Sequence, residues 1–180
     1  MPKALVSDER GPWLRSGVRT LLDGGCAAVT VVLGAAVTEA LPLLAPDLSH
    51  RDTPSDGSEG QVPGVAVVVA DDWAEGMSAS LRAGLRALED TDADVAVVHL
   101  VDLPDVGPAV VARVLADGGT LARASYDGVP GHPVLIGRDH WAGVVASVTG
   151  DEGARGYLET HDAAVVECGD LATGQDVDQR

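Results

Sequence analysis

Short apolar runs rich in valine alternate along the chain with stretches of helical periodicity. A continuous β-branched run is typical of a strand buried on both faces, because neither face of such a strand meets water. The strongest strand predictions are residues 29–33 (VTVVL), 65–69 (VAVVV) and 95–100 (VAVVHL). Weaker patterns predict strands at residues 121–126, 133–136 and 164–167.

The segments between these runs place apolar residues three or four positions apart, which is the spacing of one helix face. In residues 13–23 this stripe contains Leu14, Val18 and Leu21, and the pattern stops at Gly24. The other predicted helices are residues 78–88 with Ser78 as the N-cap, 108–117, 138–147 and 153–160. Strands that alternate with helices form βαβ units, so the pattern predicts an α/β fold with a mostly parallel sheet covered on both faces.

One segment, residues 46–64 (PDLSHRDTPSDGSEGQVPG), interrupts the alternation. It is rich in Pro, Ser, Gly and Asp and has no periodicity, which favours a flexible, solvated surface insert over a lid. The total length of 180 residues is that of one domain, so we expect residues 1–180 to form a single unit.

Charge and composition narrow the classes of function. The chain has 12 basic and 28 acidic residues, a net charge of −16, and such a surface repels nucleic-acid backbones. The 46% of hydrophobic residues excludes general disorder, yet no apolar run is long enough to span a membrane and no signal peptide is evident. Two cysteines are too few for a disulfide framework. These features predict a cytoplasmic protein without nucleic-acid or membrane partners.

Candidate chemistry is expected where predicted strands end, because open α/β sheets bind ligands at the carboxyl ends of their strands. After residues 65–69, Gly76, Ser78 and Ser80 precede a helix whose free N–H groups could hold an anion. The alternative for a serine there is a simple N-cap. After residues 95–100, Asp102 stands where a carboxylate can bind nucleotide-associated Mg²⁺, or can start a turn before proline.

Several common motifs are absent from the sequence. There is no dinucleotide-binding glycine motif, Walker loop or nucleophile elbow. A receiver domain is excluded because Leu100 stands where the phosphoacceptor aspartate belongs and no later lysine exists. The histidines lack metal-ligand spacing, and we expect His99 to be a core residue with satisfied hydrogen bonds.

Six segments in a characteristic order point to one family: PKAL at 2–5, WAEGMSASLRAGL at 73–85, VDLPDVG at 101–107, GHPVL at 131–135, GDEGAR at 150–155 and DVD at 176–178. Across essentially the whole chain the sequence resembles the MobA-like nucleotidyltransferases, most closely the molybdenum-cofactor cytidylyltransferase branch. The resemblance implies a Rossmann-like, three-layer αβα fold. It also implies Mg²⁺-dependent transfer of CMP from CTP to a phosphorylated cofactor such as molybdopterin, with release of pyrophosphate and a molybdoenzyme as a possible partner.

Family positions carry over residue by residue. The resemblance implies catalytic roles for Lys3 and Asp102, since Lys3 closes the family's glycine-rich loop and is the single lysine of the chain. The implied nucleotide-binding residues are Lys3, Gly76, Ser78 and Ser80, and the implied metal ligands are Asp102 with Asp176 or Asp178. The implied acceptor-binding residues are Gly131, His132, Pro133, Asp151 and Arg155, although Arg155 could equally be a surface arginine paired with Asp151 or Glu152.

The sequence departs from the family at its start. Family members begin with a strand and a glycine-rich loop directly before Pro-Lys, and this sequence starts at that Pro-Lys. The first strand, normally central in the sheet, and most of the nucleotide loop are therefore lacking. Two explanations compete, a start codon assigned too late and a truly truncated relative. For function, guanylyl transfer within the family and a non-catalytic, cofactor-binding accessory protein remain alternatives.

Overall fold

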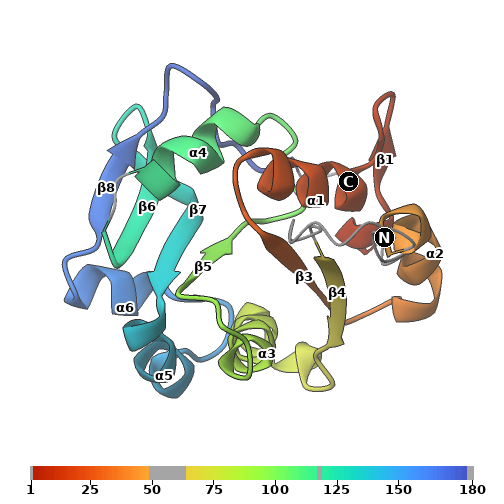
Figure 1. Ribbon diagram of the computed structural model, residues 1–180, viewed down its shortest axis with the longest axis horizontal. Coiled ribbons are helices and arrows are strands. Elements are labelled where there is room, and N and C mark those ends of the chain that lie inside the picture. The colour runs from red at the N-terminus through yellow and green to blue at the C-terminus, as the bar shows by residue number, and fades with distance from the viewer. Residues whose placement is uncertain (1, 49–63, 117–118, 178–180) are drawn as a thin grey trace, which may run out of the picture.

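The computed structural model describes residues 2–48, 64–116 and 119–177. Strands form a central layer, with α1 (Trp13–Asp23) and α4 (Pro108–Ala116) on one face and α3 (Met77–Glu89) and α5 (Arg138–Ser147) on the other (Figure 1). The predicted α/β class and the three-layer arrangement are confirmed.

The strands fall into three hydrogen-bonded groups. Parallel strands β3 (Ala28–Leu33) and β4 (Gly64–Val69) form one pair. A second group has the order β5-β7-β6-β8, and a short hairpin joins the remaining two strands. The bounds of these strands are β5 Val95–Val98, β7 Val129–Gly137, β6 Leu121–Tyr126, β8 Ala164–Glu167, β1 Ser7–Asp8 and β2 Gly11–Pro12.

The expectation of a mostly parallel sheet is corrected by β7, which runs antiparallel to both β5 and β6. The reason is the two-residue turn between β6 and β7, formed by Asp127 and Gly128 at φ 51° and 79°. Two successive residues with positive φ form the tight turn whose twist suits antiparallel neighbours. The pair β6–β8 is parallel, so the four-stranded group is a mixed sheet.

Strands β3 and β5 define a seam in the middle of the sheet layer. No strand among the described residues hydrogen-bonds to both, and the two groups remain separate sheets. The resemblance implies the family's first strand at such a central place. Helices span the seam instead, since α3 packs on β3 and against α5 while α1 packs against α4.

The helices follow the predicted pattern with one exception. Helices α1 and α5 have the predicted bounds, and α3 begins one residue earlier than expected. Helix α6 (Arg155–Thr160) starts two residues later than predicted, and 3₁₀ turns cover Lys3–Leu5 (η1) and Trp73–Glu75 (η3).

Helix α2 (Val37–Leu48) is the exception, because its two prolines disfavour helix and no helix was expected there. Full burial of Ala40 and Leu44 outweighs this local preference. The predicted insert at 46–64 is therefore too long, since α2 covers its first three residues and Gly64 begins β4. Residues 49–63 lie outside the described part of the chain, so their predicted flexibility stays a prediction.

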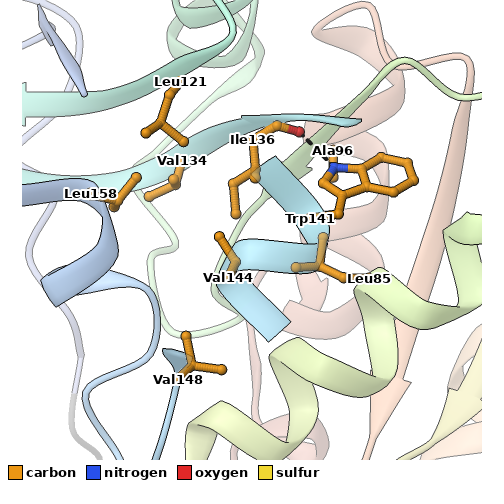
Figure 2. Packing of buried hydrophobic residues seen from close by; sticks show 9 residues of the cluster. All are labelled: Leu85, Ala96, Leu121, Val134, Ile136, Trp141, Val144, Val148 and Leu158. Carbon is orange, nitrogen blue, oxygen red and sulfur yellow. Dashed lines mark hydrogen bonds between the residues drawn. The ribbon is translucent and has the colours of Figure 1, made fainter. Parts of the chain in front are cut away.

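Apolar side chains form separate clusters on the two sides of the seam. One cluster joins α1, α2, β3 and β4, and two others cover the faces of the four-stranded sheet. In Figure 2 the indole Nε1 of Trp141 donates to the backbone carbonyl of Ile136 at 2.9 Å, which satisfies the polar atom of a buried ring. Within the described residues, no helix has the length and apolar character needed to cross a membrane.

Candidate active site

A cavity of about 480 Å³ opens beside the segment that follows β5. Its lining residues come from five separate parts of the chain: Lys3, Met77, Leu100–Leu103, Gly131–His132, and Gly174 with Asp176. The position is the one expected for an α/β fold, since the carboxyl end of a strand leads into it.

Lys3 and Asp102 meet in this cavity as an ion pair, although they are far apart in sequence. Asp102 follows β5 and its side chain is 10% exposed, whereas the Lys3 side chain is 46% exposed. The ammonium group therefore lies at the open side and the carboxylate lies deeper. A lysine in this position supplies a mobile point charge to an anionic ligand, and an aspartate supplies oxygen ligands to a cation.

Asp176 reaches the same cavity through a segment that hydrogen bonds hold in place. The backbone N–H and hydroxyl of Thr173 donate to the Asp105 carboxylate at 2.7 and 2.6 Å. The Val177 N–H then donates to the backbone carbonyl of Asp102 at 3.0 Å. The structure thus brings together two of the predicted metal ligands, and the third, Asp178, lies outside the described residues.

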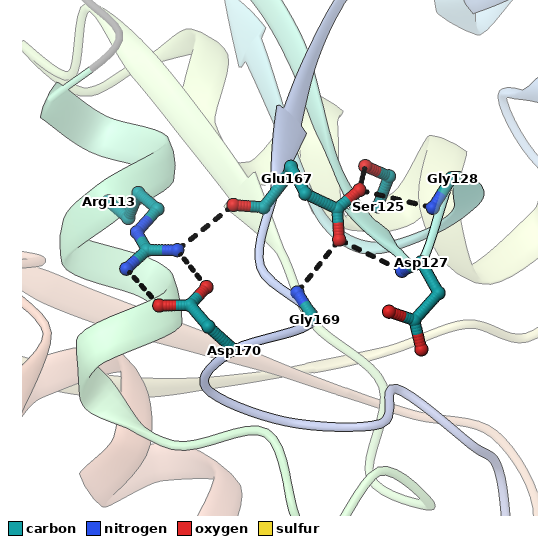
Figure 3. Close-up of polar contacts among 7 residues, drawn as sticks. All are labelled: Arg113, Ser125, Asp127, Gly128, Glu167, Gly169 and Asp170. Carbon is teal, nitrogen blue, oxygen red and sulfur yellow. Dashed lines mark hydrogen bonds and ion pairs between the residues drawn. The ribbon is translucent and has the colours of Figure 1, made fainter.

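The start of this C-terminal segment is clamped to the sheet (Figure 3). The Glu167 carboxylate accepts hydrogen bonds from the Ser125 hydroxyl and from the backbone N–H groups of Asp127, Gly128 and Gly169. These bonds, that from Ser125 above all, lower the pKa of Glu167 to about 2. Arg113 pairs with Asp170 and also donates to the Glu167 carbonyl at 3.0 Å, so helix α4 fixes the turn after β8.

The donor set suits Mg²⁺ bound together with a nucleotide. Carboxylate oxygens of Asp102 and Asp176 are hard ligands, which Mg²⁺ prefers. In the described parts of the chain, no group of three His, Cys, Asp or Glu residues could hold a metal alone. Mg²⁺ usually keeps waters and binds substrate phosphates through one or two carboxylates, so two carboxylates are compatible with it.

Gly131 and His132 line a further part of the cavity wall. Burial lowers the pKa of His132 to about 4, helped by the nearby charges of His99 and Arg123, so the imidazole is neutral at physiological pH. The neighbouring Pro133 is buried and joined to His132 by a cis peptide bond. A neutral imidazole at this wall can donate or accept a hydrogen bond without adding charge.

The predicted nucleotide loop and the predicted acceptor loop contact each other. Gly76, at φ 113°, lies so close to Gly150 and Asp151 that a Cβ atom would be 2.7 Å from the Gly150 carbonyl. The Asp151 carboxylate accepts from the Met77 N–H at 3.2 Å, and the Gly150 carbonyl accepts from the Ser78 N–H at 2.9 Å. Neighbouring protein groups thus occupy the first N–H groups of α3.

Ser78 is not the N-cap that the sequence predicted. The helix begins at Met77, and Ser78 is fully buried with its hydroxyl unpaired among the described residues. Ser80 is partly buried, and neither serine lines the cavity. Their role in nucleotide binding stays a prediction.

Arg155 lies at the start of α6 and does not line the cavity. Its guanidinium pairs with Glu159 one helical turn away at 3.0 Å, and its side chain is 74% exposed. The surface pairing anticipated for this residue is therefore present, with Glu159 as the partner in place of Asp151 or Glu152. Acceptor binding by Arg155 stays a prediction.

Sequence reasoning missed several residues around the cavity. His99 was expected to be satisfied, but its Nδ1 is buried without a hydrogen-bond partner among the described residues. Gly174 and Met77 line the cavity, and the Tyr126 ring lies next to Gly174. Only Met77 had a local signal, because it belongs to the segment after a predicted strand.

The chain has an α/β fold in which a lysine and aspartates line a cavity at the end of a strand. The model of the MobA-like NTP transferase domain matches residues 1–165, and the chain therefore belongs to this family. Family membership supports a nucleotidyltransferase, and the family depends on divalent metals.

Several known proteins are similar to this chain over most of their length. Nicotine blue oxidoreductase of Paenarthrobacter nicotinovorans is 29% identical over 188 residues, covering 98% of this chain and 83% of the relative. The Rv0371c homolog of Mycobacterium sp. strain JC1 matches with a TM-score of 0.75 at 24% identity, covering 99% of this chain and 83% of its own. A nucleotidyl transferase of Methanothermobacter thermautotrophicus gives a TM-score of 0.70 at 21% identity, over 92% and 74% of the two chains.

One further structural neighbour contains a metal. The manganese complex of Rv0371c from Mycobacterium tuberculosis H37Rv matches with a TM-score of 0.66 at 22% identity, covering 93% of this chain and 80% of that one.

Proposed function

We propose that this protein transfers CMP from CTP to a phosphorylated small-molecule cofactor such as molybdopterin, in the cytoplasm and with Mg²⁺. The observation that carries the proposal is the meeting of Lys3, Asp102 and Asp176 in one cavity at the end of β5. In a chain of net charge −16, an anionic nucleotide needs such a local cation and a metal site to bind.

The aspartates and the lysine have different proposed roles because their charges are opposite. Asp102 and Asp176 would hold Mg²⁺, which neutralises charge on the transferring phosphate and on the leaving pyrophosphate. Lys3, which contacts Asp102 in the structure, would supply its charge to the triphosphate when the nucleotide binds. An oxygen of the acceptor phosphate then attacks the α-phosphorus of CTP, and the bond to the pyrophosphate oxygen breaks. Such a reaction needs positioning and charge cancellation more than covalent help from the protein.

The acceptor side is proposed for Gly131, His132 and Pro133, together with Asp151 on the neighbouring loop and Arg155 at the start of α6. His132 lines the cavity as a neutral hydrogen-bonding group. This wall suits a heterocycle with both donors and acceptors. A molybdoenzyme that receives the product is the protein partner we propose.

The second candidate function is an oxidoreductase that acts on an organic dye, as the name of the relative nicotine blue oxidoreductase suggests. Its identity to this chain is higher than that of the nucleotidyl transferase neighbour. Apolar residues Met77, Leu100 and Leu103 line much of the cavity and would suit an organic dye. Guanylyl transfer, with GTP as the donor in place of CTP, is a variant of the first proposal within the same family.

Thermal unfolding with each of CTP, GTP, ATP and UTP, with and without Mg²⁺, tests donor binding first. A ligand that binds only the folded state raises the midpoint by mass action. We expect a rise with CTP and Mg²⁺ together. Incubation with Mg²⁺, CTP and a phosphorylated pterin should then release pyrophosphate, measured by a coupled phosphate assay.

Asp102→Asn is the decisive variant, and Asp92→Asn is its matched control. Asp92 is an exposed aspartate on the loop before β5 and does not line the cavity. We expect Asp102→Asn to lower turnover by a factor of about 100 or more while unfolding cooperatively, and Asp92→Asn to retain activity. Pyrophosphate release with no difference between the two would refute the metal role. Redox turnover of nicotine blue, followed by the absorbance of the dye and without pyrophosphate release, would favour the second candidate.

A further inference from the structure

Tyr126 contacts two walls of the cavity without lining the cavity itself. It is the last residue of β6, and only 5% of its surface is exposed. One wall contains Gly131 and His132, and the other contains Gly174 and Asp176. These walls come from segments more than forty positions apart, so their relative position depends on what packs between them.

The hydroxyl of Tyr126 holds the first wall. It donates a hydrogen bond to the backbone carbonyl of His132 at 2.6 Å. The ring also lies close to Gly131, where a Cβ atom would be 2.9 Å from Cε2. A residue larger than glycine would have to displace the ring or the strand, so the fit at this wall is tight.

The same ring holds the second wall. Gly174 lies so near the ring that a Cβ atom there would overlap Cδ2 and Cε2. Its φ of 63° lies in the left-handed region, which favours glycine. Between this contact and the hydrogen bond from Val177 to Asp102, the backbone has little freedom, and Asp176 stands in that short span.

We propose that Tyr126 is a positioning residue that sets Asp176 relative to Asp102 and links this metal side to the His132 wall. The hydrogen bond to the His132 carbonyl fixes the plane of the ring, and Gly174 rests against that ring. Without the hydroxyl the ring is held less firmly, and the backbone of Gly174 that rests on it then positions Asp176 less well. The metal-binding part of this inference rests on the proposed function.

Mn²⁺ binding in the presence of CTP, measured from the electron paramagnetic resonance signal of free Mn²⁺, tests the proposal. The variants are Tyr126→Phe, Asp176→Asn and the double variant, with Tyr157→Phe as matched control. Tyr157 also uses its hydroxyl in a hydrogen bond, to His140 at 3.1 Å, but lies on α6 away from the cavity. We expect Tyr126→Phe to weaken Mn²⁺ binding about fivefold, the factor of one net hydrogen bond, and Tyr157→Phe to leave it unchanged.

The double variant separates positioning from a general loss of stability. If Tyr126 acts through Asp176, the double variant binds Mn²⁺ as Asp176→Asn does alone, because the two effects share one cause. Effects that multiply would overturn the proposal, as would wild-type affinity in Tyr126→Phe.

A metal-free measurement keeps the inference independent of the proposed function. In the ¹⁵N-resolved spectrum, Tyr126→Phe should shift the amide signals of Gly174 and Asp176, and Tyr157→Phe should not. If the wild-type chain binds no Mn²⁺ with CTP, the proposed function fails, and these amide shifts decide the positioning role alone. Unmoved signals in Tyr126→Phe would overturn it.

Discussion

Replacing His99 by leucine should remove a specific part of the acid sensitivity of this protein. His99 follows β5 and packs beside Gly17 of α1, with Nδ1 buried and unpaired among the described residues. Burial lowers its pKa to about 4, and the nearby Asp102 carboxylate only partly offsets this. The folded chain therefore keeps His99 neutral under conditions in which an unfolded chain protonates it.

The size of the effect follows from proton linkage. At about pH 5 a histidine with the ordinary pKa of 6.5 is almost fully protonated in the unfolded chain, whereas folded His99 stays neutral. Proton uptake by the unfolded state alone lowers the free energy of unfolding by about 2 kcal/mol between about pH 7.5 and about pH 5. Because folding lowers the pKa of His99, the full free energy of unfolding is present above pH 6.5, and this part of it is lost as the pH falls toward 4. His132 acts in the same direction, so the wild-type chain should lose about 4 kcal/mol.

Urea unfolding at the two pH values measures this directly. His99→Leu should lose about 2 kcal/mol less than the wild-type chain on acidification, with an unchanged dependence on urea concentration. At the higher pH it should be at least as stable, because an unpaired buried nitrogen is removed. Equal losses in both proteins would refute the reasoning. So would a titration of the His99 ring protons by NMR that gave an ordinary histidine pKa.

Three further changes test other parts of the structure. Gly174→Ala should unfold more easily than Gly128→Ala by about 1–3 kcal/mol in urea, since both glycines have positive φ but only Gly174 faces the Tyr126 ring; equal losses would contradict the contact. Glu167→Gln should make the melting temperature fall less steeply between pH 4.5 and about 2. The Glu167 carboxylate stabilises the fold above its ordinary pKa and loses this effect as it becomes protonated. An unchanged pH profile would show that the hydrogen bonds to Glu167 do not stabilise the fold. Trp141→Phe should lower the free energy of unfolding by about 2 kcal/mol, since a buried carbonyl loses its indole donor; a change near zero in denaturant titrations would show that the bond is dispensable.

Local patterns predicted most of the fold, and tertiary contacts account for what they missed. Valine runs located β3, β4 and β5 because β-branched residues favour strands, although alternate positions of these strands are only partly buried. Helix α2 was missed because its prolines argue against a helix. Burial of Ala40 and Leu44 in the hydrophobic cluster with α1, β3 and β4 stabilises that helix, and a local pattern does not show which neighbours a segment will meet.

The antiparallel course of β7 had a visible signal that the strand pattern did not use. Asp127-Gly128 between two apolar runs favours a tight hairpin, and the structure has one there. Hydrophobic alternation alone does not distinguish strand directions, so the sheet was expected to be mostly parallel.

In the candidate site, too, some residues were predicted from the sequence and others were found only in the structure. Lys3, Asp102 and Asp176 were predicted through the resemblance and line one cavity. Tyr126 and Gly174 meet only because the chain folds back over more than forty positions. No local pattern of residue types encodes such a contact, so sequence reasoning could not find it.

The seam between β3 and β5 separates two hydrogen-bonded sheets that we expect to open to solvent as separate units. Strand hydrogen bonds do not cross it within the described residues, so amide hydrogens of β3 and β4 should exchange with solvent independently of those in the four-stranded sheet. Lys3 belongs to one unit, and Asp102 and Asp176 belong to the other. A nucleotide bound among these three residues would therefore join the units, and slower exchange in β3 would report its binding from a distance.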